Sequence, residues 1–172
     1  MLPMPGTLSP MKLLVALVLT IACISAWADT ITGRVVGVTD GDTIRVLDAE
    51  HVQYKVRLAG IDAPESKQPY GARSKKNLSD LIFGKTVTVE FAKHDRYGRV
   101  VGKVLLENVD MDLGQIEVGL AWHYKQYAKE QSLEDRQRYS EAEDRARAGR
   151  LGLWLDPRPI PPWEWRRGGF AR

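Results

Sequence analysis

VTDGDTIRV (residues 38–46) and VRLAGIDAPE (residues 56–65) both run from a β-rich segment into an acidic turn. Strand-like runs surround them, separated by Asp40-Gly41 and by a polar turn at residues 48–50. These runs are residues 30–38, 43–47 and 52–58. Because three consecutive strands are joined by short connections, the sequence predicts an antiparallel meander.

Period-two alternation assigns the faces of these strands. Tyr54, Val56 and Leu58 alternate with polar residues, which places Arg57 on the polar face. Two further strands are expected from the alternating Val87, Val89 and Phe91 and from residues 100–106. Five strands are typical of a small Greek-key barrel of the OB type.

Helical spacing appears in three places, so we predict three α-helices. The first covers residues 70–83, and the second carries Leu113, Ile116 and Leu120 at i, i+3 and i+7. The third is expected to start at a Ser132 cap and to stop near Gly149. Its predicted apolar stripe is Leu133, Tyr139, Ala142 and Ala146. The predicted fold class is α+β, a five-stranded OB-type Greek-key β-barrel with three α-helices.

The first 28 residues have the pattern of a signal peptide. Lys12 precedes an apolar run that leads into Ala26-Trp27-Ala28, which predicts cleavage after Ala28 and a secreted or periplasmic protein. A retained membrane anchor and lipidation at Cys23 are weaker alternatives. Because Cys23 is the only cysteine, the exported part would contain no disulfide or thiolate metal site.

The remaining chain divides into a predicted domain at residues 29–155 and a Pro/Trp/Arg-rich tail at residues 156–172. A formal charge of +3 and a pI near 9.0 favour polyanions only mildly. In the tail, Trp163 and Trp165 are expected to clamp the barrel as an extended segment. Alternatively, they form an accessory nucleic-acid or wall contact together with Arg166 and Arg167.

Acidic and basic residues at the strand ends suggest phosphate chemistry. Asp42 and Asp62 follow neighbouring strands, and oxygen ligands without His or Cys nearby favour calcium or magnesium over zinc. Arg57 and a second arginine from HDRYGRVVG (residues 94–102) could hold one phosphate by forked hydrogen bonds. The three histidines form no ligand set, and each is interpreted as a surface or turn residue. They are His51, His94 and His123.

In this order and spacing, VTDGDTIRV, VRLAGIDAPE and DRYGRVVG resemble the motifs of the thermonuclease family, the nucleases similar to staphylococcal nuclease. The resemblance extends through GLAWHY (residues 119–124) and covers residues 31–154. It implies an OB-type barrel and a calcium-dependent endonuclease that cleaves DNA and RNA, with little sequence preference, to leave 3'-phosphates.

The resemblance also implies roles for individual residues. It assigns Arg57, Glu65 and Arg99 to catalysis, with the glutamate assisting the attacking water. The implied Ca2+ ligands are Asp42, Asp62 and the backbone carbonyl of Ala63, where a familiar member has threonine. Asp40 is a supporting acid, and Arg96 stands where a lysine is familiar and should attract a phosphate. Tyr97 is the clearest aromatic residue on the predicted active face. Tyr124 either stacks on a nucleotide of the substrate or packs under the third helix.

From these assignments we expect a monomer that prefers single-stranded or breathing DNA and RNA. The alternative is a non-catalytic OB-fold module that binds nucleic acid, since fold does not fix function. All five matched catalytic and carboxylate positions are filled by competent residues, which counts against that alternative. A calcium-binding structural domain would leave Arg57 and Arg99 unexplained.

Overall fold

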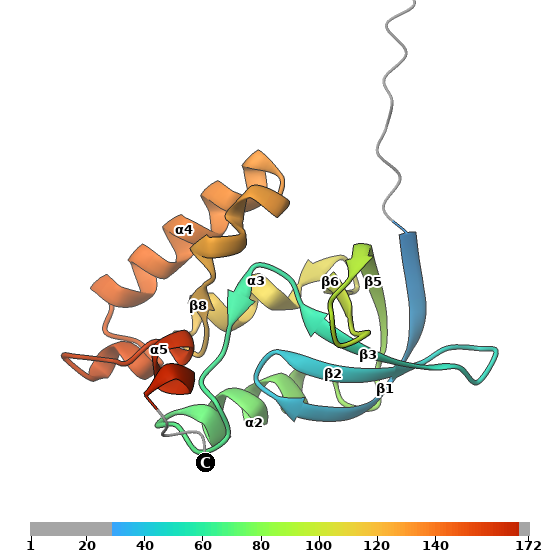
Figure 1. Cartoon of the computed structure of the whole chain (residues 1–172), viewed down its shortest axis with the longest axis horizontal. Helices are drawn as coiled ribbons and strands as arrows, with labels where there is room; N and C mark the ends of the chain where they lie inside the picture. The colour runs from blue at the N-terminus through green and yellow to red at the C-terminus, as the bar shows by residue number, and fades with distance from the viewer. Residues whose placement is uncertain (1–28, 169–172) are drawn as a thin grey trace, which may run out of the picture.

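The computed structural model describes residues 29–168 (Figure 1). The predicted signal peptide, with Cys23 and the cleavage site after Ala28, lies outside these residues, and so do the last four residues of the tail. Among the described helices, none combines the length and the apolar character needed to cross a bilayer.

Five strands close into a barrel, which confirms the predicted fold class. Antiparallel pairing runs in the order β3-β2-β1-β5-β6, and β3 then pairs in parallel with β6, from Val56↔Val100 to Leu58↔Gly102. The five strands are β1 (Asp29–Asp40), β2 (Thr43–Leu47), β3 (Gln53–Leu58), β5 (Thr86–His94) and β6 (Val100–Leu106). The two-residue strand β7 (Val109–Asp110) pairs antiparallel with the end of β6.

Alternate side chains along the strands point into the barrel and fill its interior, as the sequence predicts. Val56 and Leu58 on β3 are buried, and Arg57 between them lies on the outer face. The other strands contribute the remaining interior side chains. They are Ile31, Val35, Ile44, Val46, Val87, Val89, Val100 and Val104.

Three helices pack beside the barrel, as Figure 1 shows for α2 below the strands and α4 above left. They are α2 (Gly71–Ile82), α3 (Met111–Glu117) and α4 (Leu133–Ala148). The Ser132 cap is confirmed, because its hydroxyl accepts from the Asp135 N–H at 3.0 Å.

Two details of the predicted helices were wrong. Leu120 lies beyond the end of α3, since its N–H bonds the Gln115 carbonyl in a turn that follows the helix. Leu133 is 79% exposed, because the first residue of α4 lies past the edge of the core, whereas Tyr139, Ala142 and Ala146 are buried.

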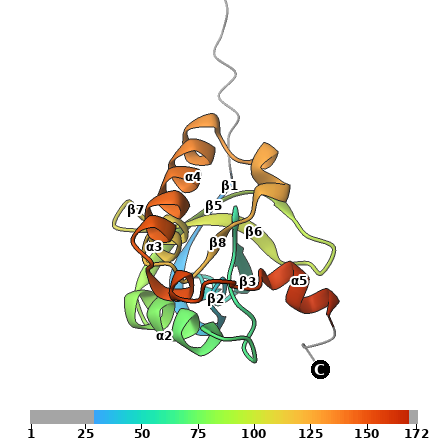
Figure 2. The same ribbon diagram turned by 90° about the vertical axis from the view of Figure 1, so that its left-hand side faces the viewer.

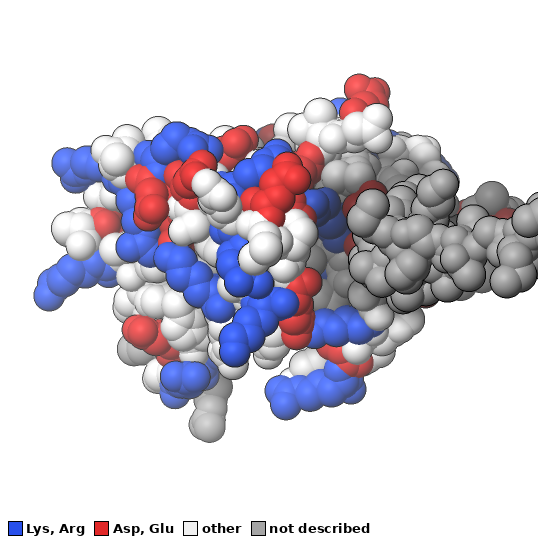
Figure 3. Space-filling view, turned by 90° about the horizontal axis from the view of Figure 1, so that it is seen from above, with Lys and Arg blue, Asp and Glu red and all other residues white. Residues whose placement is uncertain are grey.

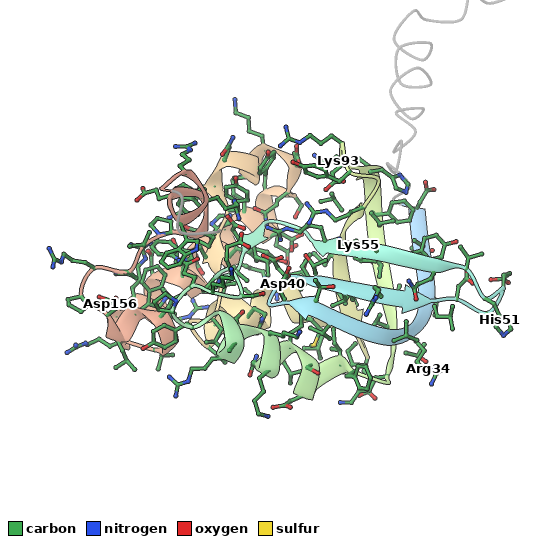
Figure 4. All side chains as sticks on the ribbon, turned by 60° about the horizontal axis from the view of Figure 1, so that its bottom comes forward. Arg34, Asp40, His51, Lys55, Lys93 and Asp156 are labelled. Atoms are coloured by element: carbon green, nitrogen blue, oxygen red, sulfur yellow. The ribbon has the colours of Figure 1, made fainter. Side chains whose placement is uncertain are left out.

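A second, two-stranded sheet links β4 (Ile61–Asp62) to β8 (Trp122–His123). His123, expected at the surface, is 2% exposed because this pairing draws it under α4. The other two histidines are exposed as predicted. Figure 4 shows His51 at the far tip of the β2–β3 hairpin, well away from Asp40.

The tail is folded differently from its predicted extended form. After η1 (Lys125–Glu130), α4 and the 3-10 helix η2 (Gly152–Leu155), the chain forms the short helix α5 (Pro162–Arg167). Pro162 stands in the first turn, where a helix tolerates a missing N–H. Figure 2 shows α5 apart from α4 and α2, on the side of β3 and β8.

Candidate active site

Two carboxylates and one guanidinium meet where β2 begins and where β3 and β4 end. Asp42 precedes Thr43, which pairs with Arg57 across the β2–β3 ladder. Arg57 Nη1 lies 3.1 Å from Asp42 Oδ2, and Arg57 Nη2 lies 2.9 Å from Asp62 Oδ1. One fork therefore spans both carboxylates, so the two acids are within reach of a single small cation.

The turn that carries Asp42 is held tightly in place. A Cβ atom on Gly41 would lie 1.8 Å from Ser74 Oγ, so this turn requires glycine to approach α2 closely. Gln115 Nε2 donates to the Gly41 carbonyl at 2.8 Å, and Ala63 N–H donates to Asp42 Oδ2 at 2.6 Å. Contacts with α2 and α3 thereby hold the turn that carries the Asp42 carboxylate in one position.

Burial and charge act in opposite directions on these groups. Burial raises the pKa of Asp62, while hydrogen bonds from Arg166 and the charge of Arg57 oppose that rise. Burial alone would lower the pKa of Arg57, but Asp42 and Asp62 outweigh it and raise the pKa. Burial and the neighbouring Asp42 also raise the pKa of Asp40 to about 7. Asp40 Oδ1 accepts from the Asp42 N–H at 3.1 Å, a backbone contact that suits a supporting residue.

A third arginine reaches the same carboxylates from the tail. Arg166 on α5 donates from Nη1 to Asp62 Oδ1 at 3.2 Å and from Nη2 to Asp62 Oδ2 at 2.8 Å. Its Nη1 also lies 2.7 Å from Glu65 Oε1. Sequence reasoning left Arg166 out of the site. The available signal was its position three residues after Trp163, which puts both on one face if the tail is helical.

The β5–β6 hairpin holds the other predicted arginines. Arg99 Nε lies 2.7 Å from Asp95 Oδ2, and Arg96 Nη2 donates to the Tyr97 hydroxyl at 2.6 Å. The guanidiniums of Arg96 and Arg99 both lie over the Tyr97 ring, at 4.8 and 5.6 Å from its centroid. Tyr97 itself is 67% exposed, so this tip offers aromatic and cationic groups to solvent.

Within residues 29–168, Arg99 forms no hydrogen bond or ion pair with Asp42 or Asp62, but the strand register places it on the same side of the barrel. Val101 pairs with Arg57 across the parallel β3–β6 seam, and Arg99 lies two residues earlier on the same outer face. Strand spacing then gives roughly 8 Å between the Cα atoms of Arg57 and Arg99. Two long side chains at that separation can converge on one phosphate.

An aromatic group borders the site on the side of α5. Tyr124 follows β8 and stacks on Trp163 with ring centroids 5.4 Å apart and planes 7° apart. Tyr127 meets Tyr124 edge-on at 4.9 Å. One predicted substrate contact, Tyr124, is therefore beside the carboxylates, while Tyr97 lies on the separate β5–β6 hairpin.

The donor chemistry fits a hard cation with few protein ligands. Within residues 29–168, no three His, Cys, Asp or Glu side chains are grouped so as to hold a metal. Asp42 and Asp62 nevertheless converge on one guanidinium, and a second guanidinium covers both oxygens of Asp62. Positive charge is thus favoured at this position, and calcium and magnesium can complete their coordination with water and substrate oxygens.

Acids and arginines clustered at one end of an OB-type barrel suit phosphate chemistry, and comparison with known proteins specifies the family. Residues 55–156 match the family described as staphylococcal nuclease homologue. The chain is 41% identical over 175 residues to a micrococcal nuclease of Shigella flexneri, covering 95% of this chain and 96% of that protein.

Two uncharacterized endonucleases are similarly related. The one from Haemophilus influenzae is 40% identical over 156 residues, which cover 90% of this chain and 84% of the relative. The one from Escherichia coli is 43% identical over 137 residues, which cover 79% and 85%. The chain therefore belongs to the staphylococcal nuclease family of nucleases.

Proposed function

We propose that this chain is a secreted, calcium-dependent endonuclease that hydrolyses phosphodiester bonds of DNA and RNA and leaves 3'-phosphates. The single observation that carries this proposal is the fork of Arg57 across Asp42 and Asp62, at 3.1 and 2.9 Å. It brings the expected metal carboxylates and an expected catalytic arginine into one group at the end of the barrel.

The metal site would be formed by Asp42, Asp62 and the backbone carbonyl of Ala63. A calcium ion bound there would neutralise charge on a phosphate oxygen. The same carboxylates now hold Arg57, so a cation that takes them over would release its fork toward the substrate. Two parallel N–H donors match two phosphate oxygens, which an ammonium group cannot do.

The reaction needs a water molecule placed opposite the leaving oxygen. Glu65 follows the Asp62 turn, and its carboxylate is about one-third exposed, at 35%, so it can accept a hydrogen bond from such a water. Water adds to phosphorus, its proton passes to Glu65, and the bond from phosphorus to the 5'-oxygen breaks. The 5'-oxygen then takes a proton from solvent, and the phosphate remains on the 3' side.

Arg57 and Arg99 would stabilise the extra negative charge of the pentavalent transition state. Such fixed donors are typically worth about 3 kcal/mol each when aimed at developing charge. Arg99 would have to exchange its present Asp95 partner for the phosphate, as Arg57 exchanges its carboxylates. Asp95 keeps the hairpin folded through backbone N–H bonds from Tyr97 and Arg99.

Substrate binding would rest on phosphate contacts and stacking, with little base readout. Figure 3 shows Lys and Arg side chains interspersed with Asp and Glu over one face, without a continuous basic surface. Arg96 and Tyr97 at the hairpin tip and Tyr124 beside Asp62 would contact flanking nucleotides. This arrangement favours flexible, single-stranded segments, whose bases are free to stack on aromatic rings.

The proposal is tested by incubating the purified protein with supercoiled plasmid and with single-stranded DNA or RNA, in calcium or in EGTA. We expect cleavage only in calcium, faster on single strands, with product ends that a polymerase extends only after phosphatase treatment. Asp62→Asn should be inactive, and Asp80→Asn, a change at an exposed helix position, should match the parent. Binding without cleavage would support the OB-fold binding module instead.

Export and oligomeric state belong to the same proposal. If residues 1–28 are a signal peptide, the protein recovered outside the cytoplasm should begin at Asp29 by N-terminal sequencing. A retained anchor would leave the longer chain in the membrane fraction. Light scattering should give the mass of a monomer, since the proposed site is complete within one chain.

A further inference from the structure

The contact of Arg166 with the carboxylates spans more than half of the chain. Arg166 and Asp62 are 104 positions apart, and Arg166 and Glu65 are 101 apart. The Arg166 guanidinium uses both oxygens of Asp62 and one oxygen of Glu65. It therefore covers one expected metal ligand and the expected water-activating acid together.

Helix α5 brings Arg166 to the carboxylates through packing of its own. Trp163 stacks on Tyr124 and meets Trp122 edge-on at 5.5 Å, and Pro162 is buried. Just before the helix, the Ile160 carbonyl accepts from Gln68 Nε2 at 2.6 Å. Because residues three apart lie on one face of a helix, docking of Trp163 points Arg166 toward Asp62.

The hydrogen bonds of Asp62 leave little room for a cation beside Arg166. Oδ1 accepts from both Arg57 and Arg166, and Oδ2 accepts from Arg166. A calcium ion binds a carboxylate oxygen directly, at roughly 2.3–2.6 Å. Held at that oxygen, it would stand against a guanidinium already within hydrogen-bond distance of the same atom, and the two positive charges would repel each other.

We propose that Arg166 competes with the divalent cation for Asp62, so that the C-terminal helix sets the cation concentration at which the site fills. This inference rests on the proposed function, since it takes Asp62 as a metal ligand. In the cation-free protein, Arg166 balances the charge of Asp62 and Glu65. When the cation binds, the guanidinium leaves Asp62, and the site opens.

The size of the effect follows from how firmly Arg166 is held. The Arg166 side chain is 40% exposed, so the Arg166–Asp62 ion pair is treated as a surface pair and not as a buried one. Its interaction energy should lie at the upper end of the range for surface ion pairs. The apparent affinity for a cation equals the intrinsic affinity multiplied by the fraction of molecules in which Arg166 does not occupy Asp62. Removing the contact should then tighten calcium binding roughly fivefold.

The experiment is calcium titration by calorimetry on the purified protein and three variants. Arg166→Gln removes the guanidinium. Trp163→Ala keeps Arg166 and its charge but removes the ring that docks α5. Arg167→Gln removes the same charge from the next, exposed residue and is the matched control. We expect the first two variants to bind calcium roughly fivefold more tightly and the control to match the parent.

These four proteins, together with the Arg166→Gln/Trp163→Ala double variant, separate competition from other roles of Arg166. Combining Arg166→Gln with Trp163→Ala should add little to either change, because both act through one contact. Equal calcium affinity in Arg166→Gln and the parent would overturn the proposal. If that variant instead binds oligothymidylate more weakly in EGTA with unchanged calcium affinity, Arg166 is a phosphate ligand and the proposal is wrong.

The outcome also distinguishes this inference from the proposed function. A parent protein that binds calcium and cleaves DNA, with no gain in Arg166→Gln, refutes only the competition. A parent that neither binds calcium nor cleaves DNA refutes both. Thermal unfolding of each variant in EGTA checks that the exposed substitutions leave the fold intact.

Discussion

Asp62 and Asp112 are two aspartates that the fold seals from solvent almost equally, at 1% and 0% exposure. Their partners differ. Asp62 faces the guanidiniums of Arg57 and Arg166, which come from two separate elements. Asp112 accepts backbone N–H groups from Ala59 at 2.9 Å and from Val104 at 3.1 Å.

The difference distinguishes the carboxylate that we propose as a metal ligand from one that supports the fold. Backbone donors are held in place by the fold, so Asp112 connects the start of α3 to the residue after β3 and to the middle of β6. The side-chain donors at Asp62 can leave, so this carboxylate can exchange them for another positive partner. A buried carboxylate whose partners are arginine side chains is a candidate metal ligand, because those side chains can move away. A buried carboxylate whose partners are backbone N–H groups stabilises the fold.

The largest effect should come from removing the exchangeable acid. Asp62→Asn should lower the cleavage rate about 10³-fold, because both cation binding and the placement of Arg57 depend on that charge. Its melting temperature should stay close to the parent's, since Arg57 keeps Asp42 and Arg166 keeps Glu65. Near-parental cleavage at saturating calcium would place the metal elsewhere.

Arg57→Lys should cost about 10²-fold in turnover. An ammonium group keeps the charge but cannot span Asp42 and Asp62, or two phosphate oxygens, with parallel donors. Initial rates on single-stranded DNA at saturating substrate measure this loss directly. Arg45→Lys, at an exposed site on β2, is the matched control. Turnover close to the parent's would remove Arg57 from the mechanism.

The structural acid should show the opposite pattern. Asp112→Ala leaves the N–H groups of Ala59 and Val104 without their acceptor and should destabilise the fold by about 2 kcal/mol. Urea unfolding measures that loss. The turnover of the folded fraction at low temperature should remain within about threefold of the parent's, because cation affinity does not involve Asp112. A selective loss of calcium binding would show that the two acids are not separable.

The smallest effect concerns pH. Burial, with the neighbouring Asp110, raises the pKa of Asp112 well above 3.8, so the folded state keeps a proton that the unfolded chain releases. The stability contributed by this group is present below pH 3.8 and is lost as pH rises through the folded pKa. Between pH 3.8 and the folded pKa of Asp112, the free energy of unfolding of the parent should fall relative to that of Asp112→Asn. The fall should be at most about 1.4 kcal/mol per pH unit. Urea midpoints measured across this pH range check the sign, and a parent that gains stability over Asp112→Asn as pH rises would contradict it.

Local patterns in the sequence predicted the barrel well. Alternation at Val56, Arg57 and Leu58 set the faces of β3, and the Ser132 cap fixed the start of α4, because both signals depend on neighbours in the chain. The meeting of Asp42 with Asp62 could be predicted for a related reason. Asp42 directly precedes β2 and Asp62 closely follows β3, and these two strands are adjacent in sequence and pair directly.

Long-range packing accounts for what the sequence did not predict. His123 is buried by pairing with Ile61, and Leu133 is exposed because the core ends before it. The sequence of the proline-rich tail predicts an extended segment. In the structure Trp163 packs against Tyr124 and Trp122, and the short helix α5 forms around that contact. Arg166 then meets Asp62 across 104 residues, a pairing that no local spacing encodes.

Calcium binding to three proteins tests the central claim most directly: the parent, Asp62→Asn and Asp112→Asn, compared by calorimetry below their unfolding temperatures. We expect one calcium site in the parent, no site in Asp62→Asn, and a site of near-parental affinity in Asp112→Asn. Calcium binding that survives in Asp62→Asn, or that disappears in a folded Asp112→Asn, would contradict that claim.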